Sequence, residues 1–182
     1  MRLFIGIDLP KSLKEELSRL TAKLKKCDCD TKWVQVQNLH LSFKFLGEVN
    51  EEKIKNIEEI ISTSGKQHKT LELNLEKFGF FPNEKYPGVF FVATDTEEKL
   101  KRIYSFLEDN LQTLGFKKEE RFKSHITLAR FRSSKNIEVF KKQLESIAVK
   151  GKFPVNEITL FRSILKPQGP IYEKLFSASF KQ

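Results

Sequence analysis

The residues best suited to chemistry lie in a pattern that occurs twice, His-apolar-Ser/Thr-apolar, at 40–43 and again at 125–128. The chain has only 3 histidines, so two of them begin this pattern. Imidazole titrates near neutral pH and can donate or accept a proton. Two imidazoles, each followed by a hydroxyl, suit a phosphoryl-transfer site that uses no metal.

The first motif predicts a strand in which the histidine and the hydroxyl point the same way. Side chains of a strand alternate between its two faces. His40, Ser42 and Lys44 therefore share one face, which we expect to line a cleft, although Lys44 could equally be a solvated lysine. Phe45, together with the apolar residues at 39, 41 and 43, is predicted to face the core.

The second motif repeats this arrangement, with His125 and Thr127 projecting together from a strand. Arg130 follows the motif, and its guanidinium suits phosphate. Strict alternation places Arg130 opposite His125, so it reaches the cleft only if the strand ends or bulges. The third histidine, His68, lies among polar residues and is expected at the surface.

Alternating strands and helices fill the rest of the chain without a linker. Apolar runs and alternation predict strands over 3–9, 33–36, 40–46, 71–75, 89–93, 125–131, 155–164 and 172–180. Four helices are predicted, beginning at Pro10, after a cap at Asn50, after a cap at Thr94 or Asp95, and after a cap at Asn136. Gly65 and Gly115 are expected to follow the ends of the second and third helices.

The two halves of the chain have matching landmarks. The two motif histidines are 85 residues apart, and the helix starts at Pro10 and Thr96 are 86 apart, as are the caps Asn50 and Asn136. Chance spacing of average elements is the alternative, but the shared motif favours a divergent duplication. We therefore expect one α+β domain over 1–182 with half-repeats 1–86 and 87–182.

A two-fold relation between the half-repeats predicts the overall arrangement. It would build two small lobes, each a mainly antiparallel sheet with helices packed outside. Equivalent strands would then meet, and His40 and His125 would face one active-site cleft between the lobes.

Composition limits the class of protein. The 182 residues include 39% hydrophobic ones and 17 Phe, enough for a core. No apolar run is long enough to span a bilayer, so no membrane association is expected. Cys27 and Cys29 are spaced for neither a Cys-x-x-Cys metal site nor an easy disulfide, so we expect free thiols and a cytoplasmic protein. No metal site, cofactor motif or obligate protein partner is indicated.

The net charge of +9 favours a polyanionic partner, RNA or DNA above all. The alternative is a surface of solvated lysines and glutamates, because the charges are spread over the helices.

The paired motifs resemble those of the two-histidine phosphoesterase superfamily, and within it the RNA 2′,3′-cyclic phosphodiesterases, also described as 2′-5′ RNA ligases (LigT-like). The resemblance covers nearly the whole chain, including the segments at 2–7, 40–47, 81–82, 125–130 and 169–172. Ser42 departs from the family pattern, which usually has Thr there. The hydroxyl is kept, but the methyl group that stiffens the rotamer is lost.

The resemblance implies a bilobal fold and metal-free hydrolysis of a 2′,3′-cyclic phosphate at an RNA 3′ end to a 2′-phosphomonoester. It implies that His40 is the proton donor and His125 the proton acceptor. Ser42 and Thr127 would donate to the non-bridging oxygens, and Arg130 would bind the phosphate.

Several alternatives stay open at this point. One alternative is a basic protein that binds RNA ends without turnover, although such a protein would need no acid–base pair. Within the enzyme class, 2′-5′ ligation is the reverse chemistry, and cyclic phosphates of small nucleotides are further substrates. Tyr172, beside the 166–170 turn, could stack on a base or close the core.

Overall fold

The computed structural model describes residues 1–95 and 97–182, with the side chain of Glu97 left aside. Thr96, the predicted half-repeat landmark, lies outside the described residues. The strands are β1 (Arg2–Asp8), β2 (Thr31–Trp33), β3 (His40–Glu48), β4 (Leu71–Pro82), β5 (Pro87–Thr94), β6 (His125–Phe131), β7 (Lys152–Val155), β8 (Glu157–Lys166) and β9 (Gly169–Ser179). The helices are α1 (Lys11–Lys25), α2 (Ile54–Gln67), α3 (Glu97–Thr113) and α4 (Ile137–Glu145), with 3₁₀ turns η1 (Val36–Asn38) and η2 (Glu51–Lys53).

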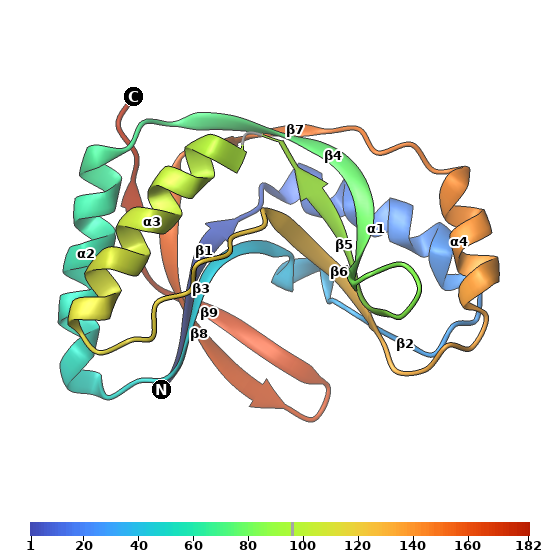
Figure 1. Cartoon of the computed structure of the whole chain (residues 1–182), viewed down its shortest axis with the longest axis horizontal. Helices are drawn as coiled ribbons and strands as arrows, with labels where there is room; N and C mark the ends of the chain where they lie inside the picture. Colours follow the sequence, from blue (N-terminus) through green and yellow to red (C-terminus); the bar gives the residue numbers. More distant parts are fainter. Residues whose placement is uncertain (96) are drawn as a thin grey trace.

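The strands form one antiparallel sheet that is symmetric about its middle. Its order is β7-β4-β5-β6-β3-β1-β8-β9, and β2 pairs with β6 beside this path. The trio β1, β3 and β8 on one side corresponds to β5, β6 and β4 on the other. The two trios meet where Leu41 of β3 pairs with Ile126 of β6, one residue after each motif histidine. The predicted α+β fold with two lobes is confirmed (Figure 1).

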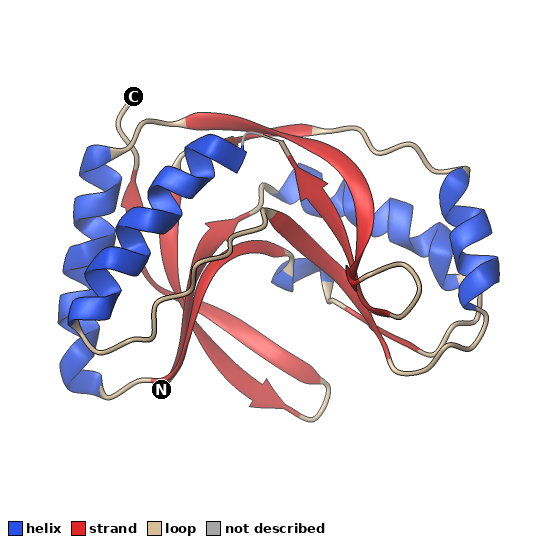
Figure 2. Cartoon of the chain, viewed as in Figure 1, coloured by secondary structure: helices blue, strands red, loops and turns tan. Residues whose placement is uncertain are grey.

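Each lobe packs its helices on the outside of the sheet (Figure 2). Helices α2 and α3 pack together beside β8 and β9, whereas α1 and α4 pack together at the other end of the molecule. Helix α1 follows β1 in the chain but lies with the opposite lobe. Each lobe therefore contains elements from both halves of the sequence, which ties the lobes together covalently several times.

Aromatic side chains form much of the core of both lobes. In one lobe Phe4 stacks on Phe161, with ring centroids 4.8 Å apart. In the other lobe Phe90 meets Phe140 edge to face at 5.0 Å. Such pairs stabilise a core beyond the burial of their area. Because Phe4 lies on β1, next to β3, this packing also forms the floor under the first motif.

Three predicted elements differ from the structure. The strand expected over 33–36 ends at Trp33, and η1 follows. The strand expected over 155–164 breaks at Asn156, because β7 pairs with β4 of one lobe and β8 with β1 of the other. Gly65 lies inside α2 rather than after it, where a Cβ would approach the carbonyl oxygen of Ser179 to 2.7 Å.

The predicted helix signals have mixed outcomes. Asn50 accepts a hydrogen bond from the backbone N–H of Glu52, so it caps η2, which leads directly into α2. Gly115 follows α3 with a φ of +87°, as a C-terminal glycine should. Asn136 precedes α4, but its side chain donates to the carbonyls of Cys27 and Asp28 instead of capping the helix.

Two sequence expectations about the whole chain can be set beside the structure. Cys27 and Cys29 are free thiols, as predicted. Within the described part of the chain, none of the helices combines the length and apolarity that crossing a bilayer requires.

Candidate active site

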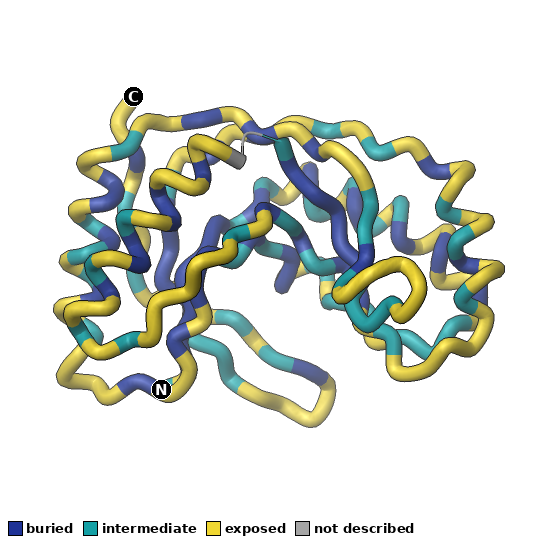
Figure 3. The backbone as a smooth tube through the Cα atoms, in the orientation of Figure 1, coloured by how far each residue is buried: buried dark blue, intermediate teal, exposed yellow. Residues whose placement is uncertain are grey.

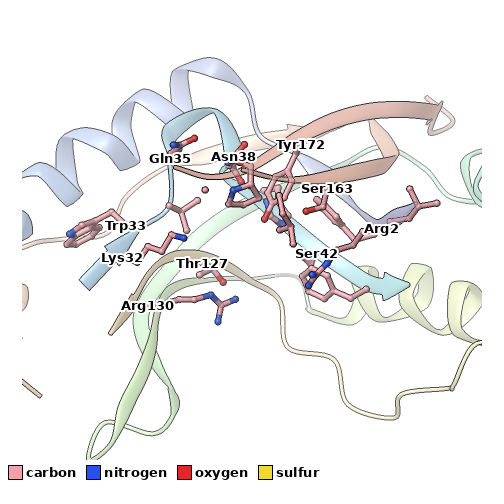
Figure 4. Close-up of a pocket in the computed structure, with 18 of the residues that line it drawn as sticks. Arg2, Lys32, Trp33, Gln35, Asn38, Ser42, Thr127, Arg130, Ser163 and Tyr172 are labelled. Carbon is pink, nitrogen blue, oxygen red and sulfur yellow. Dashed lines mark hydrogen bonds between the residues drawn. The ribbon is translucent and has the colours of Figure 1, made fainter. Parts of the chain in front are cut away.

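The two motif histidines begin the two strands that meet at the centre of the sheet. His40 is the first residue of β3 and His125 the first of β6. The central pair Leu41–Ile126, extended by one residue each way, places His40 opposite Thr127 and Ser42 opposite His125. These four residues and Arg130 line one cavity of about 380 Å³ (Figure 4). The structure therefore brings all five predicted site residues together.

Both imidazoles are held by a hydrogen bond to the backbone carbonyl two residues earlier. The Nδ1 of His40 lies 2.6 Å from the carbonyl oxygen of Asn38, and the Nδ1 of His125 lies 2.7 Å from that of Lys123. A carbonyl oxygen can only accept, so Nδ1 carries the proton in each ring. The Nε2 atom is then free to accept a proton when the ring is neutral and to donate one when it is charged. Either histidine could act as acid or as base.

The surroundings of both rings favour the neutral form. Burial lowers the pKa of His40 to about 4, and burial also lowers the pKa of His125. Aromatic rings cause much of this burial, Phe4 and Tyr172 lying 4.8 and 5.1 Å from His40 and Phe81 lying 5.0 Å from His125. The charge of His125 further lowers the pKa of His40, so the cleft resists holding two imidazolium ions.

A β-bulge follows the hydroxyl residue in both strands. The extra residue is Phe43 in β3 and Leu128 in β6, each three positions after its histidine. A bulge shifts the alternation of side chains by one. It therefore turns Arg130 into the cavity, which strict alternation would not allow, and it does the same for Phe45. Phe45 is 62% exposed, so the prediction that it belongs to the core is wrong.

The same bulge removes Lys44 from the cleft. Lys44 is 3% exposed, and its Nζ donates to the carboxylate of Glu108 on α3 at 2.8 Å and to the carbonyl oxygen of Lys117 at 2.5 Å. The backbone N–H of Glu119 donates to the same carboxylate at 2.7 Å. Both expectations for Lys44, a cleft residue or a solvated one, are wrong. Its role is to fasten β3 to α3 and to the segment that leads to His125.

Other residues line the cavity besides the five predicted site residues. Arg2 and Lys32 add two cations to Arg130, and among the described residues no acidic side chain lines the cavity. Tyr172 also lines it, on the β8–β9 hairpin. Asn38 is 5% exposed and donates from its side chain to the carbonyl oxygen of Pro170 at 2.6 Å, which fastens that hairpin beside His40. The sequence had left Tyr172 open between stacking on a base and closing the core.

Two further expectations concern residues away from the cavity. His68 is half-buried at the end of α2, with Nδ1 at 2.9 Å from the carbonyl oxygen of Ser64 and its ring against Phe106. It is a packed residue rather than a plain surface one. Among the described residues, no cluster of three or more His, Cys, Asp or Glu side chains is placed to hold a metal ion.

A family model described as LigT like Phosphoesterase matches residues 7–91 and, a second time, residues 92–172. The chain belongs to the LigT-like phosphoesterase family. The RNA 2′,3′-cyclic phosphodiesterase of Methanocaldococcus jannaschii is 35% identical, over 95% of this chain and 97% of its own. That of Archaeoglobus fulgidus is 36% identical, over 96% of this chain and 98% of its own.

Solved structures of other proteins have the same fold. TT0787 of Thermus thermophilus superimposes with a TM-score of 0.83 at 28% identity, covering 100% of this chain and 98% of that one. E. coli LigT in complex with 3′-AMP superimposes with a TM-score of 0.81 at 25% identity, again covering 100% and 98%. The family and the two-lobed fold that the sequence resemblance predicted are both confirmed.

Proposed function

We propose that this LigT-like enzyme hydrolyses 2′,3′-cyclic phosphates at RNA 3′ ends to 2′-phosphomonoesters, using two histidines and no metal. The observation that carries the proposal is the pair of imidazoles in one cavity, each with Nδ1 engaged and Nε2 available. The curated relatives named as RNA 2′,3′-cyclic phosphodiesterases support the substrate class. We treat the whole chain, 1–182, as one bilobal domain for this function.

The proposed reaction is a single displacement at phosphorus. Neutral His125 accepts a proton from a water molecule as the water oxygen bonds to phosphorus. The bond from phosphorus to the 3′ oxygen breaks on the opposite side, and protonated His40 donates its proton to that oxygen. The phosphate stays on the 2′ oxygen. General acid–base help of this kind contributes about 10²–10⁴-fold.

The pKa order of the two rings runs against this division of roles, because burial lowers the pKa of His40 more strongly than that of His125. A bound phosphate diester changes the balance. Its negative charge next to Nε2 favours the imidazolium form and raises the pKa of the nearer ring. The assignment of His40 as donor follows the family resemblance, and it requires this substrate-induced rise.

The rest of the cavity suits an anion whose charge grows in the transition state. Ser42 and Thr127 project beside the histidines, and their hydroxyls would donate to the non-bridging oxygens. Arg130 offers a guanidinium for the same phosphate. With Lys32 and Arg2 also lining the cavity, the site would attract RNA by its charge.

The direct test is an end-product assay on an RNA oligonucleotide with a 2′,3′-cyclic phosphate, run with and without excess EDTA. We expect conversion to a 2′-phosphomonoester at the same rate in both. A 3′-phosphate product, or abolition by EDTA with rescue by one divalent ion, would contradict the proposed mechanism. Binding of the RNA with no turnover in either condition would instead favour an RNA-end-binding protein.

A further inference from the structure

Phe45 is an apolar ring exposed inside a catalytic cavity, and neither the proposed hydrolysis nor the fold uses it. It is 62% exposed and lines the cavity that contains both histidines. Its ring centroid is 5.6 Å from that of Phe4, which in turn lies 4.8 Å from His40. Phe45 is thus one aromatic ring away from the reacting centre.

The two-fold relation of the strands makes Arg130 the counterpart of Phe45 in the other half of the site. Phe45 and Arg130 each lie five residues after a motif histidine, and equivalent bulges turn both into the cavity. Arg130 presents a cation where Phe45 presents a flat apolar face. One side of the cleft is therefore built for a phosphate and the other for an apolar, planar group.

A cation lies on the same side as Phe45. Arg2, the first residue of β1, lines the cavity. Burial raises the pKa of Tyr172, and the positive charges of Arg130 and Arg2 both oppose that rise, so Arg2 lies close enough to act on this wall of the cavity. Figure 4 places Arg2 and Ser163 at one end of the cleft and Lys32 and Trp33 at the other, with Ser42 and Thr127 between them. Arg2 thus lies at a different end of the cleft from Lys32, beyond the hydroxyls that face the reacting phosphate.

We propose that Phe45 and Arg2 form a subsite for the penultimate nucleotide, the one on the 5′ side of the nucleotide that carries the cyclic phosphate. Its base would stack on Phe45, and Arg2 would bind the phosphodiester that links the two nucleotides. A flat ring beside a cation matches one nucleotide of single-stranded RNA, and stacking accepts any base because every base has a π-face. The proposal rests on the proposed function and extends it. The substrate is then an RNA end whose last two nucleotides are unpaired, rather than a free mononucleotide.

The β8–β9 hairpin supplies a further wall of the same cavity. Leu165 lines the cavity and is 65% exposed, which adds a second apolar surface. The hairpin projects from the body of the molecule, and much of its far end is exposed (Figure 3). A base between the hairpin and Phe45 would bury apolar surface that both now present to water.

The test compares three substrates: a dinucleotide with a terminal 2′,3′-cyclic phosphate, the same molecule with the first base removed, and the mononucleotide 2′,3′-cyclic phosphate. For the wild-type protein we expect kcat/KM to fall in that order. Stacking makes the intact dinucleotide roughly 5- to 150-fold better than its abasic form. Because each ratio is taken within one variant, a partial loss of folded protein cancels.

Substitutions then assign the two contacts. In Phe45→Ala the ratio of intact to abasic dinucleotide should fall to about 1, and in Phe45→Trp it should be kept. In Arg2→Ala the ratio of abasic dinucleotide to mononucleotide should fall. Tyr86→Ala is the matched control, since Tyr86 is an aromatic residue 66% exposed outside the cavity, and its ratios should match the wild type.

The outcomes separate the subsite from the reaction. A wild-type ratio in Phe45→Ala, or equal kcat/KM for all three substrates in the wild type, would overturn the subsite and leave the hydrolysis intact. Failure to hydrolyse any of the three would overturn the proposed function instead. In that case the same ratios, measured as affinities for the 2′-phosphorylated dinucleotide with and without its first base, still decide on the subsite.

Discussion

The two halves of the candidate active site have the same backbone arrangement and differ in their side chains. Each begins with a histidine whose Nδ1 meets the carbonyl two residues earlier, continues with a hydroxyl, and then bulges. Four and five residues after the histidine the halves diverge: Lys44 and Phe45 in one, Ala129 and Arg130 in the other. The repeat therefore keeps the backbone that presents the two imidazoles and the two hydroxyls, while the residues that follow them differ in type and in burial.

The environments of the two rings differ in the same way. His40 lies among Phe4, Phe161 and Tyr172, so burial lowers its pKa to about 4. His125 lies against Phe81 and Phe91, and burial lowers its pKa, with smaller contributions from the charges of Lys123 and Arg130. Equivalent strands thus give the two imidazoles different surroundings, and burial lowers the pKa of His40 more strongly than that of His125.

The largest expected effect on stability comes from Lys44, a buried charged residue in β3 whose equivalent in β6 is the buried, uncharged Ala129. Lys44→Met leaves the carboxylate of Glu108 buried without its ion-pair partner, which should cost about 3–5 kcal/mol in the free energy of unfolding. Urea unfolding would measure this cost. The double variant Lys44→Met, Glu108→Leu should regain much of it, since Ala129 shows that the equivalent position in β6 needs no charge. A Lys44→Met protein as stable as the wild type would show that the pair contributes little.

The unequal burial of the histidines predicts a pH effect on stability. The pKa of His40 is about 4 in the folded protein and about 6.5 in the unfolded chain. Between these values the unfolded state binds a proton that the native state does not, so stability should fall as the pH decreases from 6.5 towards 4. The loss attributable to His40 is about 3 kcal/mol. Unfolding at pH 7 and pH 4.5 should show a smaller loss in His40→Asn than in the wild type, and an unchanged loss would contradict the assigned burial.

The two hydroxyl residues extend the comparison, because Ser42 lacks the methyl group that Thr127 carries. Ser42→Ala and Thr127→Ala should each lower kcat by about 10–10³-fold, since each removes one donor to a charged oxygen. Ser42→Thr restores the residue type of the second motif and should keep most of the activity. Steady-state kinetics with folding checked by circular dichroism would measure this. Wild-type rates in both alanine variants would mean that the hydroxyls are structural.

The sequence was sufficient to predict the histidine pairing and the lobes, because period-two alternation and a repeated motif are local signals. The bulges at Phe43 and Leu128 are not local in this sense, because an extra residue leaves the apolar pattern of the strand nearly unchanged. Without them, Lys44 and Phe45 are assigned to the wrong faces. The partner of Lys44 is Glu108, 64 residues away, and only the packing of α3 on β3 brings them together.

The change of lobe at Asn156 shows a second limit. The strand predicted over 155–164 continues across that point, because no glycine or proline lies within it to mark a break. The structure divides it because β7 completes one lobe and β8 the other. Tyr172, which the sequence had left open between a stacking role and a core role, lines the cavity, because the β8–β9 hairpin carries it there.

The proposed mechanism depends most on the division of labour between His40 and His125. It is tested most directly with a substrate whose 3′ oxygen is replaced by sulfur, because a thiolate leaves without needing a proton. On the ordinary substrate His40→Ala and His125→Ala should each lose about 10²–10⁴-fold in kcat, and the double variant should be little worse than either. On the sulfur substrate we predict that His40→Ala recovers nearly to the wild-type rate while His125→Ala does not. Rescue of His125→Ala instead would reverse the roles, and wild-type hydrolysis by the double variant would contradict the two-histidine mechanism altogether.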